Sequence, residues 1–193
     1  MPRARSCSSP STRSTSACGR SGSTSPPELR GKRVVLRPVK PGDEATLLEI
    51  FSDPTVAQWW GDPRKAVADT MEAEEGESHF LIQVDGETIG IVQSYEESDP
   101  MYHHAGIDIA IRSPWQRKGL GPDAIRTLAR HLIDERGHHR LTIDPAAHNT
   151  GAIKAYERVG FRPVGRLRQY ERGPDGTWHD GLLMDMLADE LRD

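Results

Sequence analysis

The chain has 193 residues and a formal net charge of −4, a length that suits one folded domain with a tail. It contains no apolar run long enough for a signal-peptide core or a membrane span. Both cysteines, Cys7 and Cys18, lie near the N-terminus. The rest of the chain therefore excludes a disulfide framework, a cysteine-based zinc site and a cysteine nucleophile, which fits a cytoplasmic protein that inserts into no membrane.

The first 28 residues are rich in Ser, Thr, Pro and Arg and have few apolar side chains to offset the entropy of ordering. We predict a disordered tail over 1–28 and a folded domain over 29–193. The tail composition also resembles a transit peptide, but without an amphipathic pattern, so a floppy extension or an upstream translation start is the simpler interpretation.

The charge balance changes once this tail is set aside. Residues 1–27 hold four of the 25 basic residues and no acidic residue, so the remainder carries 21 basic against 29 acidic residues. An acidic domain argues against sequence-independent binding of nucleic acid and is compatible with a cationic substrate.

The first third of the predicted domain indicates a strand followed by two helices. Lys32–Val39 alternates as a strand does. Asp43 is a plausible N-cap of a helix that ends at Ser52-Asp53-Pro54. Its predicted apolar face consists of Leu47, Leu48, Ile50 and Phe51. A second helical segment is predicted over Arg64–Glu75.

The middle of the chain has the clearest sequence pattern for secondary structure. Phe80–Val84 and Thr88–Tyr95 are apolar runs joined at Asp85-Gly86, which predicts a β-hairpin with a type I′ turn. The polar segment Glu96–His104 predicts a loop, and Ala105–Ile111 predicts a further strand.

The last third predicts two helices and three strands. Gly121–Arg136 is strongly amphipathic, and a helix over Asn149–Val159 ends at Gly160 in the C′ position. The predicted strands are Arg140–Ile143, Arg162–Tyr170 and Trp178–Met186. This order predicts a single mixed α/β domain.

A glycine-containing loop, Gln116–Gly121 (QRKGLG), lies between a predicted strand and a predicted helix. Backbone N–H groups at a helix N-terminus attract anions, and glycines let the backbone approach a phosphate closely. Arg117 and Lys118 add positive charge. The loop matches neither a dinucleotide G-x-G-x-x-G nor a Walker P-loop, and on its own it is more simply interpreted as a glycine turn between a strand and a helix.

A second motif follows at Asn149–Phe161 (NTGAIKAYERVGF). In this order, the two motifs resemble the pyrophosphate-binding loop and the second coenzyme A-binding region of the GNAT acetyltransferases, a resemblance that covers 29–191. It implies a GNAT fold, in which a central, mostly antiparallel sheet splays between two parallel strands and is flanked by helices. It also implies acetyl-coenzyme A as co-substrate and no metal.

Within that superfamily, the chain looks most like the aminoglycoside 6′-N-acetyltransferases. The segments that carry this narrower resemblance are Val56–Gly61, Gly90–Tyr95, Gly106–Asp108 and Ile143–Pro145. Related acyltransferases that modify siderophore lysines or protein amines could carry the same segments, so those acceptors stay open as alternatives. A third hypothesis for the function is a non-catalytic module that binds acyl-coenzyme A.

The resemblance assigns roles to the strand Ile107–Ile111, whose N–H groups around Ile109 and Ile111 would meet the thioester carbonyl and the pantetheine arm. The residues it implies for the coenzyme are Ile109, Ala110, Ile111, Gln116, Arg117, Lys118, Gly119, Leu120, Gly121, Asn149, Ala152 and Tyr156.

Tyr156 matches the family tyrosine that acts as general acid toward the leaving thiolate. A phenol with a pKa near ~10 donates to a thiolate whose acid has a pKa near ~8.5, so complete transfer is uphill by roughly 2 kcal/mol. Hydrogen bonding to the thiolate therefore matters more than complete transfer. The alternative is a tyrosine that only packs.

Asp108 stands within an apolar run, where an unpaired buried carboxylate would be costly, so we expect it to line a cleft. It is the candidate base, directly or through water, because an ammonium with a pKa near ~10.4 is rarely neutral at pH 7. The same carboxylate stabilises the ammonium, so the alternative is that Asp108 binds the cation more than it deprotonates it.

The resemblance places the acceptor between acidic and aromatic side chains. The residues predicted to contact the acceptor are Trp59, Trp60, Tyr95, Glu96, Asp99, Asp108 and Asp144. The alternative for Asp144 is a turn residue before proline. Because adjacent side chains on a helix cannot both face one way, one of the two tryptophans is expected to pack in the core. The histidines are interpreted as surface residues or as partners in local hydrogen bonds, with His103 a remote base candidate. The expected partner is a polycationic aminoglycoside, and the protein is a monomer or a homodimer.

Overall fold

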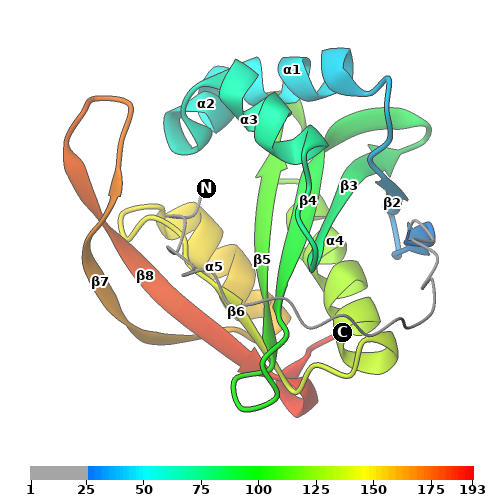
Figure 1. Ribbon diagram of the computed structural model, residues 1–193, viewed down its shortest axis with the longest axis vertical. Helices are drawn as coiled ribbons and strands as arrows, with labels where there is room; N and C mark the ends of the chain where they lie inside the picture. The colour runs from blue at the N-terminus through cyan, green and yellow to red at the C-terminus, as the bar shows by residue number, and fades with distance from the viewer. Residues whose placement is uncertain (1–25) are drawn as a thin grey trace, which may run out of the picture.

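The computed structural model describes residues 26–193, and Figure 1 shows the arrangement of the elements. The predicted tail lies outside the described residues except for its last three. The described chain forms one eight-stranded sheet in the order β1-β2-β3-β4-β5-β6-β8-β7. The strands are β1 (Leu29–Arg30), β2 (Val35–Pro38), β3 (Glu77–Val84), β4 (Glu87–Glu97), β5 (His104–Ile111), β6 (Arg140–Ile143), β7 (Arg162–Arg172) and β8 (Trp178–Leu187).

Five α-helices flank the sheet: α1 (Glu44–Ser52), α2 (Pro54–Trp60), α3 (Pro63–Met71), α4 (Leu120–Arg130) and α5 (Thr150–Val159). Short helical turns cover Ser113–Trp115 and Ala188–Glu190, and α4 continues as a π-helical turn over His131–Glu135. The predicted mixed α/β class with a mostly antiparallel sheet is confirmed. No helix among residues 26–193 is long and apolar enough to cross a membrane.

Two apolar clusters pack on opposite faces of the sheet. The first joins the side chains of α4 and α5, such as Ile125, Leu128 and Val159, to one face. The second joins α1 and α2 to the other face, where Leu81, Ile91 and Ala110 come from neighbouring strands. Both cores exclude water, which is the main source of stability in such a domain.

The sheet has one parallel junction, between β5 and β6. The strands are paired only at Ala105 with Leu141 and at Gly106 with Thr142, while every other junction is antiparallel. Beyond Gly106, β5 continues to Ile111 alongside β4 alone. The two parallel strands therefore separate toward their carboxyl ends, as the resemblance implied.

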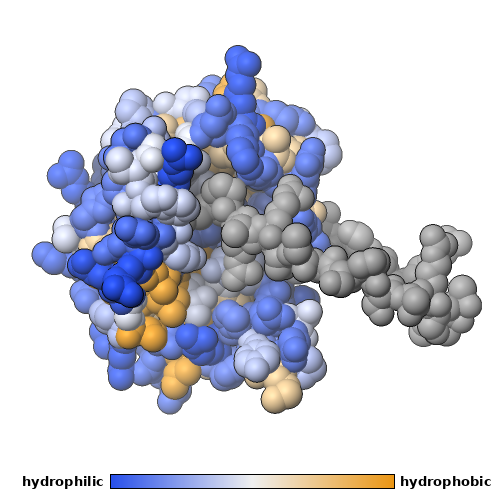
Figure 2. All heavy atoms as spheres, turned by 60° about the vertical axis from the view of Figure 1, so that its left-hand side comes forward, coloured by the Kyte–Doolittle hydropathy of each residue, from blue (hydrophilic) through white to orange (hydrophobic). Residues whose placement is uncertain are grey.

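The long β7–β8 hairpin projects from the sheet edge beyond β6 (Figure 1). Figure 2 turns this side forward and shows a surface that is mostly hydrophilic. Most side chains of β7 remain outside the apolar cores, since only Leu167 and Glu171 of this strand are even partly buried.

Several predicted boundaries differ from the structure. Asp53-Pro54 ends α1 as expected, but it also starts α2, which was not predicted: Asp53 accepts from the N–H of Thr55, and Pro54 takes the first helical position. Strand β4 continues through Glu97, two residues into the predicted loop. The Asp85-Gly86 turn has φ values of 50° and 83°, which confirms the predicted type I′ geometry.

Candidate active site

A cleft opens where β5 and β6 separate, and α2 and the loop after β6 close its sides. Its lining residues are Trp59, Trp60, Asp108, Ile109, Ile143, Asp144, Pro145, Ala146, Asn149 and Tyr156. The structure thus brings together residues from four distant segments that the sequence analysis had assigned to the acceptor or the coenzyme. The separation of two strands exposes backbone groups that would otherwise be paired in the sheet.

Asp108, Asp144 and Tyr156 form the polar centre of this cleft. Tyr156 is 8% exposed, and burial raises the pKa of its phenol, with further increases from the negative charges of Asp108 and Asp144. A phenol with a raised pKa keeps its proton throughout the neutral range, so it is a permanent donor. This protonation state is the one that a hydrogen bond to a leaving thiolate requires.

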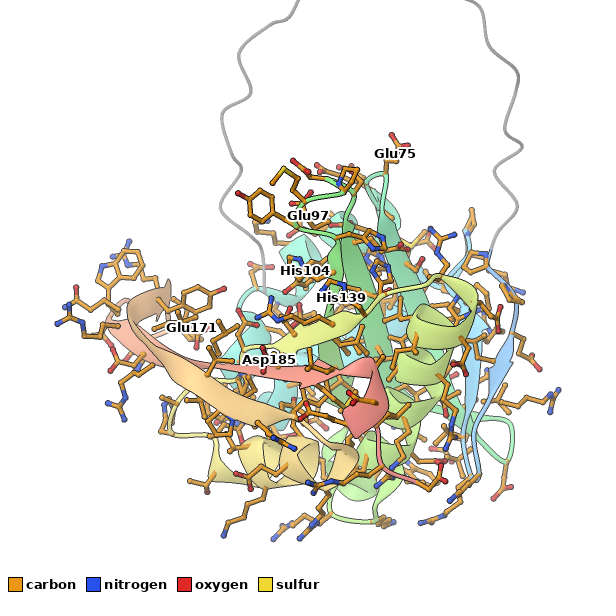
Figure 3. The ribbon with its side chains drawn as sticks, turned by 90° about the horizontal axis from the view of Figure 1, so that it is seen from below. Glu75, Glu97, His104, His139, Glu171 and Asp185 are labelled. Atoms are coloured by element: carbon orange, nitrogen blue, oxygen red, sulfur yellow. The ribbon has the colours of Figure 1, made fainter. Side chains whose placement is uncertain are left out.

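Two further residues reach this region from the β7–β8 hairpin, and the sequence analysis missed both. The phenol of Tyr170 donates a hydrogen bond to a carboxylate oxygen of Asp144. Burial raises the pKa of the Glu171 carboxyl, and the charges of Asp144 and Asp108 raise it further. The carboxyl group of Glu171 is thus affected by the negative charges of Asp108 and Asp144, although it does not line the cleft itself. Figure 3 labels Glu171 on the hairpin.

The paired tryptophans both line the cleft, but they have different partners. The ring of Trp60 packs against Phe51 at a centroid distance of 5.2 Å, which ties it to the core beneath α1. The ring of Trp59 instead lies 5.0 Å from that of His148, on the loop after β6. The aromatic wall is thus made by α2 together with a loop from the opposite side of the cleft.

The remaining predicted acceptor residues separate into two groups. Tyr95 lies on β4 opposite Gly106, on the sheet face that also carries Asp108. Glu96 faces the other way: it pairs with Arg136 and accepts a 2.8 Å hydrogen bond from His138. Asp99 is exposed in the β4–β5 turn, where its carboxylate accepts from the N–H of Met101. The structure does not bring Glu96 or Asp99 to the cleft.

The loop Gln116–Gly121, predicted to bind phosphate, has the backbone shape that an anion site requires. Arg117 and Gly119 have φ values of 59° and 78°, and Gly119 is the N-cap of α4. A Cβ on Gly119 would meet nothing nearer than Arg33 at 3.8 Å, so the backbone is open to a ligand. Arg117 and Lys118 are exposed beside it. These residues fit a pyrophosphate held by backbone N–H groups and flanking cations.

Two other residues predicted for the coenzyme make contacts within the protein. Gln116 donates to the carbonyl of Ile111 at 2.7 Å and to the hydroxyl of Thr55 at 2.8 Å, and thereby fixes the loop to β5 and α2. Asn149 caps α5, because its side chain accepts from the N–H of Ala152 at 3.2 Å. Both contacts shape the site rather than offer polar groups to it.

The histidine pairs lie away from the cleft. His104 and His139 lie near the adjacent starts of β5 and β6 (Figure 3), and the ring of His103 stacks on that of His138 at 4.2 Å. In the part of the chain that the structure describes, no three His, Cys, Asp or Glu side chains are grouped to hold a metal ion.

The fold and the two coenzyme motifs agree with the family comparison. The profile of the acetyltransferase (GNAT) domain matches residues 33–162. The chain belongs to this family, and it is an N-acetyltransferase that takes its acetyl group from acetyl-coenzyme A.

Among its relatives, the chain is 31% identical over 164 residues to the aminoglycoside N(6′)-acetyltransferase type 1 of Klebsiella pneumoniae, covering 74% of this chain and 79% of the relative. It is 30% identical to the streptothricin acetyltransferase of Streptomyces lavendulae, over 75% and 77% of the two chains. A solved structure of AAC(6′)-Ib with paromomycin and acetyl-coenzyme A superposes with a TM-score of 0.67 at 28% identity, over 82% and 96% of the chains.

Proposed function

We propose that this acetyltransferase acts on an amine of an aminoglycoside antibiotic, with the 6′-amine as the acceptor position, and so confers resistance. The observation that carries the proposal is the pair of carboxylates, Asp108 and Asp144, in one cleft with an aromatic wall. Carboxylates attract a polycationic sugar, and the ring of Trp59 offers a flat apolar surface to it. The similarity to an aminoglycoside N(6′)-acetyltransferase supports the same acceptor.

The proposed chemistry divides between two side chains and the backbone of β5. Asp108 binds the attacking ammonium and accepts its proton, directly or through water, so that the neutral amine attacks the thioester carbonyl. The backbone of β5 around Ile109 polarises that carbonyl. When the tetrahedral intermediate collapses, the C–S bond breaks, and Tyr156 donates a hydrogen bond to the departing thiolate.

A thiol-release assay with acetyl-coenzyme A tests the acceptor class. We expect turnover with kanamycin or tobramycin at a kcat/KM at least about tenfold above that with spermidine, because a flexible polyamine cannot use the aromatic wall. NMR of the product locates the new amide. Turnover with streptothricin or a peptide amine, but not with aminoglycosides, would contradict the proposed acceptor while leaving the acetyltransferase activity intact.

The variant Asp108→Asn, measured in the same assay, isolates the proposed base. We expect kcat/KM to fall by about 100-fold or more, since it loses both the charge and the proton acceptor. Asp134→Asn is the matched control, because Asp134 is an exposed aspartate on the π-helical extension of α4. Equal activity of the Asp108→Asn variant and the wild type would remove Asp108 from the mechanism.

A further inference from the structure

The β7 strand changes register beside the cleft. Leu167 pairs with Gly181 and Glu171 pairs with His179, so three residues of β7 lie opposite Asp180 alone. Within this bulge, Gln169 has a φ of 49°, a conformation that side chains other than glycine seldom adopt. Bulges of this kind redirect side chains and occur preferentially near active sites.

The side chain of Asp180 holds the bulge in place. One carboxylate oxygen accepts from the backbone N–H of Gln169 at 2.8 Å, and the other accepts from Arg166 at 3.2 Å. The carbonyl of Asp180 also accepts from the N–H of Ala147 at 2.8 Å. The same residue therefore links the bulge to the loop that follows β6 and carries Asp144.

The bulge directs Tyr170 across β8 toward this loop. Its ring covers Gly181: a Cβ at that position would lie 2.9 Å from Cδ1 of Tyr170. The backbone of Gly181 in turn bridges to Ala146 on the loop. From this position the phenol of Tyr170 donates to Asp144. Glycine at residue 181 and the bulge at residues 168–170 are thus both needed for the phenol to reach the carboxylate.

We propose that Tyr170 is a positioning residue for the acceptor and acts through Asp144. The inference rests on the proposed function, in which the Asp144 carboxylate binds a cationic group of the acceptor. A charge-assisted hydrogen bond from the phenol fixes the plane of that carboxylate, so the acceptor meets an already oriented anion. The Asp180-capped bulge sets the position of the phenol.

The variant Tyr170→Phe keeps the ring over Gly181 and removes only the hydroxyl. We expect the KM for the aminoglycoside to rise about tenfold, with kcat within about twofold and the KM for acetyl-coenzyme A unchanged, since hydrogen bonds to charged groups contribute at this level. Tyr102→Phe is the matched control, because Tyr102 is 68% exposed on the β4–β5 turn. An unchanged acceptor KM, or equal losses in all three parameters, would overturn the positioning role.

The bulge is tested separately at Asp180. Asp180→Ala removes the acceptor of the Gln169 N–H and should reproduce the rise in acceptor KM, whereas Asp180→Asn retains a side-chain oxygen and should recover most of the wild-type KM. If the Ala variant has the wild-type acceptor KM, the bulge does not set the position of Tyr170.

Crystal structures of the wild type and Tyr170→Phe in one crystal form give a readout that needs no acceptor. We expect the Asp144 carboxylate to leave its wild-type orientation in the variant. An unchanged carboxylate would overturn the inference even for an active aminoglycoside acetyltransferase. A reoriented carboxylate in a protein that acetylates no aminoglycoside would instead refute the proposed acceptor and leave the contact between Tyr170 and Asp144 established.

Discussion

The ring of Tyr95 occupies the space that a side chain at residue 106 would need: a Cβ on Gly106 would lie 1.8 Å from Cζ of Tyr95. The two residues are paired across β4 and β5, two residues before the pair that contains Asp108. Because Gly106 is also the last residue of β5 paired to β6, the contact lies where the two parallel strands separate.

Replacement of Gly106 by Ala should therefore displace the ring of Tyr95 and disturb the cleft. We expect a loss of about 1–3 kcal/mol in the free energy of unfolding, as for other overpacked sites, together with a lower kcat/KM. Urea unfolding and the thiol-release assay measure these effects. Gly151→Ala is the control, because a Cβ there meets only Asn149 at 3.8 Å and should stabilise the exposed side of α5.

A double variant shows whether the ring is the cause. In a Tyr95→Ala background, the space above Gly106 is vacated. Gly106→Ala should therefore lower the free energy of unfolding much less in this background than in the wild type. Equal costs in both backgrounds would mean that the destabilisation comes from the strand backbone and not from the contact between Tyr95 and Gly106.

The predictable parts of the structure were those with local chemical causes. The turn at Asp85-Gly86, the end of α5 at Gly160 and the loop Gln116–Gly121 follow from residue types at fixed offsets, and the structure places each of these elements as predicted. The prediction that Asp108 and Asp144 both lie at the acceptor site, by contrast, came from the family resemblance and not from a local sequence pattern.

The missed features depend on register, which no short pattern reports. Tyr170 reaches Asp144 from a bulge in β7, and nothing in its neighbouring residues indicates the position of that bulge. Glu96 was predicted in a loop, but β4 extends through it, and the alternation of a strand then turns its side chain toward His138. A shift of one residue in a strand moves a side chain to the opposite face.

Tyr156→Phe tests the proposed donor to the thiolate. We expect kcat to fall by about 100-fold while the KM for acetyl-coenzyme A stays within about threefold, because only a hydroxyl is lost. Burial and the two neighbouring carboxylates raise the pKa of the phenol, so Tyr156 should contribute no basic limb to the wild-type pH profile below about pH 9. A wild-type kcat in the variant would show that Tyr156 only packs.

The basic side chains of the loop Gln116–Gly121 should affect the binding of acetyl-coenzyme A and not that of the acceptor amine. Arg117→Ala and Lys118→Ala should each raise the KM for acetyl-coenzyme A by about fivefold, and the effect should shrink at high salt because both side chains are exposed. Lys154→Ala, an exposed site on α5, is the charge-matched control. Steady-state kinetics at two salt concentrations would disprove the assignment if all three variants behaved alike.

The stability of the wall that carries the tryptophans should depend on pH through Asp53. Its carboxylate accepts from the N–H and hydroxyl of Thr55 and from the N–H and hydroxyl of Ser113, which joins the start of α2 to the segment after β5. Burial alone would raise the pKa of this carboxyl, but the hydrogen bonds outweigh burial and lower it from 3.8 to about 2.

A carboxyl with a lowered pKa in the folded state stabilises the protein above its unfolded pKa, and this contribution is lost as the pH falls through the folded value. We therefore expect Asp53→Asn, which keeps an N-cap oxygen but not the charge, to cost on the order of 1 kcal/mol at neutral pH. Urea unfolding of both proteins should show this difference shrinking below about pH 4 and approaching zero only below about pH 2. A difference that is constant with pH would mean that the charge of Asp53 contributes nothing, and that the cost comes from the altered geometry of the cap.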